Sequence, residues 1–302
     1  MSLTAFRRTG QSRAMTNPDT RPETPARIRD LAPRYDAILC DVWGVIRDGR
    51  SLLPEAIEAL QRFRAGGGRV VLVSNSPRKP GGLLKQLAEM GAPEDAWDDA
   101  VTSGGATHEV LKARAPGPAF KLGPDWDDSI YDGTGLEFAP LDQARVISNT
   151  GLFDWESETP EDYDDLLSRA RERGLEMVCA NPDRVVQFGD RLLYCAGALA
   201  EAYEAMGGEV IYAGKPHAPV YDSAKAKLDA LGVGWDRERL LAIGDGPETD
   251  VGGANAQGID ALFITGGILG GDFRDGLDAD AVAKTLARRE VRARYAAKAL
   301  EW

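Results

Sequence analysis

Four polar side chains stand directly after short apolar runs that are typical of buried strands. They are Asp41 after 37–40, Ser74 after 69–73, Lys215 after 209–213 and Asp245 after 240–243. In an open parallel α/β sheet, ligands lie at the carboxyl ends of the strands, so we expect these side chains to meet there. A carboxylate at that edge can act as a nucleophile or as a Mg²⁺ ligand. With the hydroxyl and the ammonium group, the two carboxylates predict a site for a phosphate and a divalent cation.

Each position taken alone also has a simpler structural explanation. An aspartate after a strand often caps the next turn, and Ser76 before Pro77 fits an ordinary helix N-cap. Asp250 follows Asp245 by five residues across a loop, which puts it near that carboxylate but not beside it. Because four such stretches occur in one chain, we favour the chemical interpretation over a set of unrelated turns.

The segments between these residues alternate between helix and strand patterns. In 54–64, apolar residues recur every three or four positions, Pro54 stands near the start and three glycines follow, which predicts a helix. The strand at 69–73 follows at once, and a strand–helix–strand unit implies parallel neighbours. A charged helical tail is expected over 278–302. The chain is therefore expected to be an α/β protein with a parallel sheet.

A second series of strands and helices begins near residue 116, and about 90 residues there are expected to form an inserted domain. The chain is then expected to return to the first sheet with the strand at 209–213. The acidic run at 161–165 fits a solvated helix start, which the helix dipole favours, rather than a metal site.

The order and spacing of these motifs resemble the haloacid dehalogenase superfamily, and more narrowly its class IIA branch of NagD-like and p-nitrophenyl-phosphatase-like hydrolases. The likeness runs from about residue 36 to residue 267, and Asn181-Pro182-Asp183 and Gly197-Ala198-Leu199 also fit this branch. It implies a Rossmann-like, three-layer core with a parallel sheet and an inserted α/β cap domain of the C2 type. The implied division is the core at 27–115 and 207–302 and the cap at 116–206. Residues 1–26 lack an apolar signal core and are basic up to Thr16, so we expect a flexible tail there rather than a transit peptide.

The resemblance also implies an Mg²⁺-dependent hydrolase that acts on a small phosphorylated metabolite through an aspartyl-phosphate intermediate. Asp41 would attack phosphorus, while Ser74 and Lys215 would bind the phosphoryl group and Asp250 would orient water or Lys215. The implied Mg²⁺ ligands are Asp41, Asp245 and the backbone carbonyl two places after Asp41, which belongs to Trp43. The residues expected to contact the substrate are Ser74, Asn75, Ser76, Asn181, Asp183 and Arg184.

Trp43 departs from the family pattern, in which a second aspartate protonates the leaving group and then activates water. An indole does not exchange a proton near pH 7, and loss of a general acid–base group typically lowers the rate by about 10²–10⁴-fold. One interpretation is a phosphatase that is slow or uses another acid, such as Asp48 or Asp183. A second is a catalytically impaired phosphate-binding protein on the same scaffold. A third is non-phosphatase chemistry such as dehalogenation, which Asp245 and Asp250 disfavour because dehalogenases of this superfamily lack that carboxylate pair.

Composition and charge exclude several other classes of protein. The 302 residues are 43% hydrophobic and 28% charged, as in ordinary globular proteins, and a net charge of −12 disfavours nucleic acid and anionic membranes as partners. No apolar run approaches the roughly 18 residues of a membrane span. Cys40, Cys179 and Cys195 lack metal-ligand spacing and are expected to be buried thiols in a reducing, cytoplasmic compartment. The chain has only two histidines, which excludes a multi-histidine metal site. Whether the protein forms a homodimer is left open by the sequence.

Overall fold

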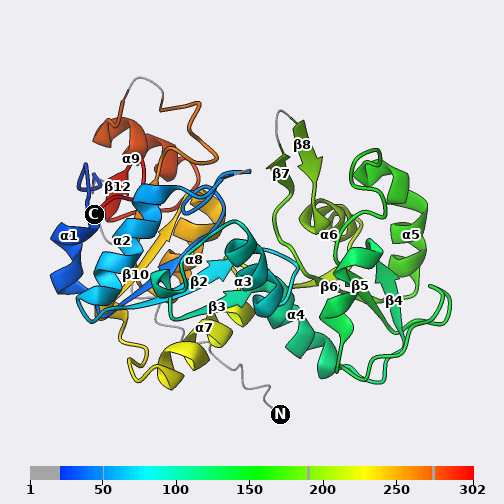
Figure 1. Ribbon diagram of the computed structural model, residues 1–302. Helices are drawn as coiled ribbons and strands as arrows, with labels where there is room; N and C mark the ends of the chain where they lie inside the picture. Colours follow the sequence, from blue (N-terminus) through cyan, green and yellow to red (C-terminus); the bar gives the residue numbers. More distant parts are fainter. Residues whose placement is uncertain (1–20, 50, 189–190, 274–275) are drawn as a thin grey trace, which may run out of the picture.

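The computed structural model describes residues 21–49, 51–188, 191–273 and 276–302. Six parallel strands form the first sheet in the order β12-β11-β10-β1-β2-β3 (Figure 1). The strands are β1 Ala37–Cys40, β2 Arg69–Ser74, β3 Asp99–Thr102, β10 Leu240–Gly244, β11 Asp260–Ile264 and β12 Tyr295–Ala297. Their side chains are apolar on both faces, as a sheet covered on both sides requires.

Helices cover both faces of this sheet. Ile38 and Cys40 of β1 pack towards α1 Ile28–Leu31, α2 Pro54–Ala65 and α3 Pro80–Glu89. Ala37 and Leu39 of the same strand pack on the opposite side, where the helices are α4 Ser103–Lys112, α7 Ala218–Ala230, α8 Gly252–Gln257 and α9 Ala279–Ala287. The alternation along β1 therefore produces two apolar layers, and the predicted three-layer α/β core with a parallel sheet is confirmed.

A second parallel sheet has the order β4-β5-β6-β9. Its strands are β4 Ala119–Leu122, β5 Val146–Asn149, β6 Glu176–Cys179 and β9 Glu209–Tyr212. One face packs on α5 Asp164–Glu172 and α6 Ala196–Ala205. The other face packs on Leu111 of α4, so α4 lies between the two sheets (Figure 1). An antiparallel hairpin, β7 Val185–Phe188 and β8 Arg191–Tyr194, extends from this module.

Short helical turns complete the described structure. They are η1 Ala32–Arg34, η2 Glu94–Ala96, η3 Asp125–Tyr131, η4 Pro160–Tyr163, η5 Arg237–Arg239 and the π turn η6 Pro247–Val251. In the described part of the chain, no helix combines the length and the apolar character that a membrane span requires.

The structure corrects three expectations. β9 pairs with β6 in the second sheet, so the chain returns to the first sheet after Tyr212 rather than at residue 207; an apolar run identifies a strand but not its neighbour. The tail after residue 278 is not one helix, because Tyr295–Ala297 is a buried strand beside β11, where burial outweighs the helix propensity of its alanines. Of the expected flexible tail, residues 1–20 lie outside the described residues, whereas Glu23 and Ala26 hydrogen-bond to the backbone around β12.

The order in which the chain adds strands to the first sheet reverses between β1 and β10. The chain adds β2 and β3 on one side of β1, and then places β10, β11 and β12 on the other side. Ala37 accordingly pairs with Arg69 in one direction and with Leu240 in the other. Ligands of open α/β sheets bind at such a switch point. The residues that follow β1 and β10 there are Asp41 and Asp245.

Candidate active site

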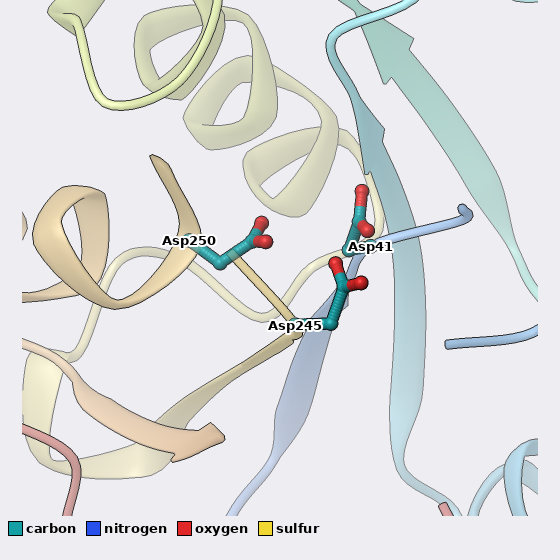
Figure 2. Close-up of side chains that lie close together, drawn as sticks. All are labelled: Asp41, Asp245 and Asp250. Atoms are coloured by element: carbon teal, nitrogen blue, oxygen red, sulfur yellow. The ribbon is translucent and has the colours of Figure 1, made fainter. Parts of the chain in front are cut away.

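Three buried carboxylates meet at the switch point of the first sheet. Asp41 follows β1, Asp245 follows β10, and Asp250 lies in the π turn η6. Each offers an oxygen within 4.8 Å of the others, and the side chains of Asp41 and Asp245 lie next to each other (Figure 2). These residues are only 8%, 7% and 6% exposed, respectively. The chain therefore gathers three acids from two distant segments in a place with little water.

Lys215 joins two of these acids. Its Nζ donates to Asp41 Oδ1 and to Asp250 Oδ1, each at 2.6 Å. Asp250 Oδ2 accepts the backbone N–H of Gly246 at 2.9 Å, so both of its oxygens are used. Asp250 is therefore placed to hold the ammonium group of Lys215 against Asp41. The lysine itself comes from the segment after β9, at the end of the second sheet.

Backbone segments pack closely around Asp245. Its Oδ2 accepts the N–H of Ile268 at 2.7 Å. A Cβ atom at Gly44 or at Gly267 would lie 2.0 Å from this same oxygen, and Gly44 also has a φ of +81°. Both positions therefore need glycine. In the sequence these glycines indicate tight turns after Asp41 and after β11, but nothing in the pattern shows that they contact Asp245.

The cluster holds more negative than positive charge. Burial, together with the charge of Asp250, raises the pKa of Asp41 well above its usual range despite the nearby Lys215. Burial and Asp250 likewise raise the pKa of Asp245 to about 7. Burial alone would lower the pKa of Lys215, but Asp250 and Asp41 outweigh it and raise that pKa. With all three acids ionised, one lysine leaves an excess of about two negative charges.

This excess and the donor set fit a divalent cation. Asp41 Oδ2 and Asp245 Oδ1 receive no hydrogen bond from residues within the described ranges. Two carboxylate oxygens side by side are ligands that Mg²⁺ and Ca²⁺ prefer. Asp250 is less suited to this role because its oxygens already bind Lys215 and Gly246. The backbone carbonyl of Trp43 stays a predicted third ligand.

The residues after β2 differ in what they have available for a ligand. Ser74 is buried at the end of the strand, and its Oγ accepts the N–H of Ser76. The hydroxyl of Ser76 accepts the N–H of Arg78. Each hydroxyl is still able to donate its own hydrogen. These two side chains therefore remain available to phosphoryl oxygens.

Asn75 is instead fully engaged by the protein. Its Oδ1 accepts the N–H of Lys215 at 2.7 Å. Its Nδ2 donates to Asp183 Oδ1 at 2.9 Å and to the carbonyl of Lys215 at 3.2 Å. An amide side chain has two N–H donors, and both are used here. Asn75 therefore ties the end of β2 to the lysine and to the second module, although the sequence suggested a substrate contact.

The three candidate residues of the second module lie differently. Asp183 reaches Asn75, and burial raises the pKa of this carboxyl. Asn181 supports it, because Asn181 Oδ1 accepts the N–H of Asp183 at 3.1 Å. Arg184 points elsewhere: its side chain is 70% exposed and its Nε lies 2.8 Å from Glu201 Oε2. The structure thus brings Asp183 to the site but leaves Arg184 on the surface.

The loop after Asp41 contains an unforeseen pair. The guanidinium carbon of Arg47 lies 4.6 Å from the ring centroid of Trp43, a cation–π contact. Arg47 is buried, its Nε donates to the carbonyl of Asp48, and its own carbonyl accepts the N–H of Gly44 at 2.8 Å. Asp48 is exposed, and its Oδ1 accepts the N–H of Ser51. An arginine four residues after Trp43 in a tight loop was the available signal for this contact.

Comparisons with known proteins agree with this geometry. Residues 38–137 match the model of haloacid dehalogenase-like hydrolases, and residues 212–288 match a HAD-hydrolase-like model. Chronophin of Rattus norvegicus is 27% identical over 75% of both chains. The ribonucleotide monophosphatase NagD of Escherichia coli K12 is 24% identical over 80% of this chain and 91% of its own.

Solved structures give the same result. A haloacid dehalogenase-like hydrolase from Brucella suis 1330 is 43% identical, with a TM-score of 0.81 over 91% of this chain and 99% of its own. Glycerol phosphate phosphatase from Mycobacterium tuberculosis in complex with magnesium shares the fold, at 24% identity and a TM-score of 0.61 over 79% of this chain and 70% of its own. The chain belongs to the haloacid dehalogenase-like hydrolases, in the NagD-like class IIA branch, and is a hydrolase of the phosphatase type.

Proposed function

We propose that this protein is an Mg²⁺-dependent phosphatase that hydrolyses a small phosphorylated metabolite through an aspartyl-phosphate on Asp41. The observation that carries this proposal is the buried cluster of Asp41, Asp245 and Asp250 around a single ammonium group. The named relatives support it, because chronophin and NagD resemble this chain over most of its length and NagD is named as a monophosphatase.

The metal would be held by Asp41, Asp245 and the backbone carbonyl of Trp43. The excess negative charge of the cluster supports a divalent ion, and the magnesium complex of the glycerol phosphate phosphatase supports Mg²⁺. When bound, this ion supplies positive charge that offsets the charge of the phosphoryl oxygens and keeps the carboxylates ionised.

The protein's own groups would then divide the work of phosphoryl transfer. Lys215 holds the carboxylate of Asp41 in position through Oδ1, and this carboxylate attacks phosphorus. The hydroxyl of Ser74 donates to a phosphoryl oxygen, and Asp250 keeps Lys215 in position. Water afterwards cleaves the acyl phosphate and restores the carboxylate of Asp41. Positioning and charge neutralisation provide most of the catalysis in this class of reaction.

The second module would act as a cap over this site. The hydrogen bond from Asn75 to Asp183 supports a cap that lies against the core at the substrate position. A cap of this kind limits the substrate to a small molecule that it can enclose. The proposed cap runs from residue 116 to about residue 212, because β9 pairs within the second sheet.

Phosphate binding without turnover is the second candidate function. Trp43, two residues after the proposed nucleophile, favours this function, because its indole ring cannot transfer a proton. The ring is held in place by Arg47. Dehalogenation is disfavoured, because it has no use for the acidic cluster of Asp245 and Asp250 beside Asp41.

A phosphatase assay distinguishes these functions. The wild-type protein is tested on p-nitrophenyl phosphate and on sugar, nucleotide and cofactor phosphates, with Mg²⁺ and with a chelator. Asp41→Asn removes the nucleophile, and Asp142→Asn serves as a matched control at an exposed position. Steady, Mg²⁺-dependent turnover that Asp41→Asn alone abolishes supports the phosphatase. If the protein binds phosphate but shows neither turnover nor covalent phosphate on Asp41, the phosphatase is contradicted and the second candidate is supported.

A further inference from the structure

The loop that follows Asp41 contains no acidic residue before Asp48. Trp43 stands between Asp41 and Gly44, and the backbone of Gly44 packs against Asp245. Isolated backbone β-bridges pair Trp43 with Arg47 and Arg47 with Leu52, so the loop folds back on itself. Its backbone therefore lies on the acidic cluster.

The two side chains that stack in this loop cannot give up a proton near neutral pH. An indole N–H and a guanidinium group donate hydrogen bonds but stay protonated. The guanidinium of Arg47 lies over the ring of Trp43 and is bound to the carbonyl of Asp48, so the pair is fixed within the loop. Between Asp41 and Asp48 the loop thus carries an aromatic ring and a positive charge, but no acid.

Other acids near the loop are committed to structural contacts. Asp48 is exposed, and its Oδ1 binds the N–H of Ser51 to form the turn. Asp183 of the second module has its Oδ1 bound by Asn75. Asp250 holds Lys215 and Gly246. Of these, Asp183 is the one that faces the site from the opposite module, so it is the competitor that an experiment must test.

We propose that this active site acts on phosphoryl donors whose leaving group is stable as an anion, namely acyl phosphates, phosphoanhydrides, and aryl or enol phosphates, rather than on phosphate esters of alcohols. The inference rests on the proposed function. The carboxylate of Asp41 forms the new bond to phosphorus while the bond from phosphorus to the leaving oxygen breaks. The electron pair of the broken bond departs with that oxygen as RO⁻, which takes a proton from solvent only after it has left.

The second half of the reaction needs no acid for its leaving group. Water attacks the phosphorus of the acyl phosphate, the bond to the Asp41 oxygen breaks, and the carboxylate departs as a stable anion. The proton of the attacking water goes to solvent or to the phosphate product. Trp43 therefore restricts the first step to certain donors, whereas the lack of a base for water slows the second step equally for every donor that completes the first.

The test is the dependence of kcat/KM on the leaving group. The wild-type protein with Mg²⁺ is assayed on acetyl phosphate, p-nitrophenyl phosphate, phenyl phosphate and glycerol 3-phosphate, whose leaving groups are progressively poorer anions. Since kcat/KM reports the first step, we expect it to fall by about 10²–10⁴-fold along this series, the range of a missing general acid. Trp43→Asp adds a carboxyl group and should raise kcat/KM for glycerol 3-phosphate, relative to that for acetyl phosphate, by about 10²-fold.

Trp43→Phe is the matched control, because it keeps an aromatic ring and adds no acid. We expect its kcat/KM to fall along the series of leaving groups as steeply as that of the wild type, whatever its absolute rate. If Trp43→Asp does not fold, as judged by circular dichroism, the wild-type series and Trp43→Phe still decide the question.

Several results would overturn the inference. One is a wild-type kcat/KM that does not depend on the leaving group. If this kcat/KM becomes strongly dependent on the leaving group in Asp183→Asn, Asp183 is the proton donor. Absence of turnover even with acetyl phosphate also overturns it, together with the proposed function. Turnover that requires Asp41 but ignores the leaving group contradicts the inference alone. Turnover that survives Asp41→Asn contradicts the proposed function.

Discussion

The two parallel sheets of this molecule use their carboxyl edges differently. The first sheet ends in Asp41 and Asp245, and these charges are buried. At the corresponding edge of the second sheet, β5 ends in a neutral residue, Asn149, whose Nδ2 donates to the carbonyl of Ala196 in α6. A parallel sheet thus provides a place where loops converge. Buried charge, rather than the sheet itself, distinguishes the candidate site from a packed edge.

The two edges are nevertheless linked, because the second sheet delivers the positive charge that the first one lacks. Lys215 follows β9 and reaches Asp41 and Asp250. Asp183 follows β6 and reaches Asn75 at the end of β2. The comparison therefore predicts that substitutions of the residues that link the two sheets change both stability and activity. The effect should grow with the charge that each substitution leaves uncompensated.

Lys215→Met should have the largest effect. It leaves Asp41 and Asp250 without their ammonium partner, and breaking a buried ion pair on one side typically costs about 3–5 kcal/mol. We expect a loss of this size in urea unfolding of the metal-free protein, together with loss of phosphatase turnover. Lys85→Met is the control, since Lys85 is 79% exposed and, among the described residues, its ion pair is with the exposed Glu89; it should change stability by less than about 0.5 kcal/mol. Wild-type stability in Lys215→Met would mean that the acids are not charged in the folded protein.

Asp245→Asn should have the next largest effect, with the opposite sign. Burial and Asp250 raise the pKa of Asp245 to about 7 in the folded protein, against about 3.9 in the unfolded chain. The stability from this group is therefore fully present below about pH 4 and is lost as the pH rises through about 7. Between about pH 5 and pH 8 the metal-free wild type should lose about 2–3 kcal/mol that Asp245→Asn keeps.

The measurement is urea unfolding with a chelator at several pH values. The asparagine can still accept the N–H of Ile268, so the variant mainly removes the charge. Added Mg²⁺ should stabilise the wild type more at pH 8 than at pH 5, and should stabilise Asp245→Asn less. Parallel pH profiles for the two proteins would show that Asp245 does not carry the excess charge.

Asn75→Ala should have an intermediate effect. It leaves the buried N–H of Lys215 without its acceptor and removes the link to Asp183, and an unsatisfied buried polar group typically costs about 1–3 kcal/mol. Asn75→Asp keeps an acceptor for that N–H but faces Asp183 with a like charge once both carboxyl groups are ionised. It should therefore be less stable than Asn75→Ala at high pH. Thermal unfolding across pH measures both. Equal stability of the two variants would argue against the contact with Asp183.

The sequence predicts the strands of the first sheet better than their surroundings. β1, β2, β10 and β11 are short apolar runs that end in polar residues, and such runs are visible without tertiary information. The sheet to which β9 belongs, the strand β12 and the hairpin β7–β8 are not visible in this way. β12 has three residues, two of them alanine, so only its burial beside β11 makes it a strand.

The candidate site shows the same limit at the level of single side chains. That Asp41 and Asp245 come together follows from neighbouring strands that end at one edge, and the structure places them together. Lys215 joins them although its strand β9 belongs to the other sheet. Their catalytic roles stay predictions. The stacking of Arg47 on Trp43 was not predicted: their spacing is a weak signal, because the direction of a side chain in a loop depends on local backbone angles that a residue pattern does not encode.

Arg184→Ala should have the smallest effect, and it tests the boundary of the site in the second module. Arg184 neighbours Asp183 in sequence, but its exposed side chain pairs with Glu201 instead of facing the core. Exposed ion pairs contribute about 0–1 kcal/mol, so stability should fall by no more than this and KM should change by less than about twofold. Asp183→Asn, one residue away, should alter turnover far more, because it faces Asn75. A tenfold rise in KM for Arg184→Ala would instead mean that this arginine leaves Glu201 and turns inward when substrate binds, so that the second module rearranges around the substrate.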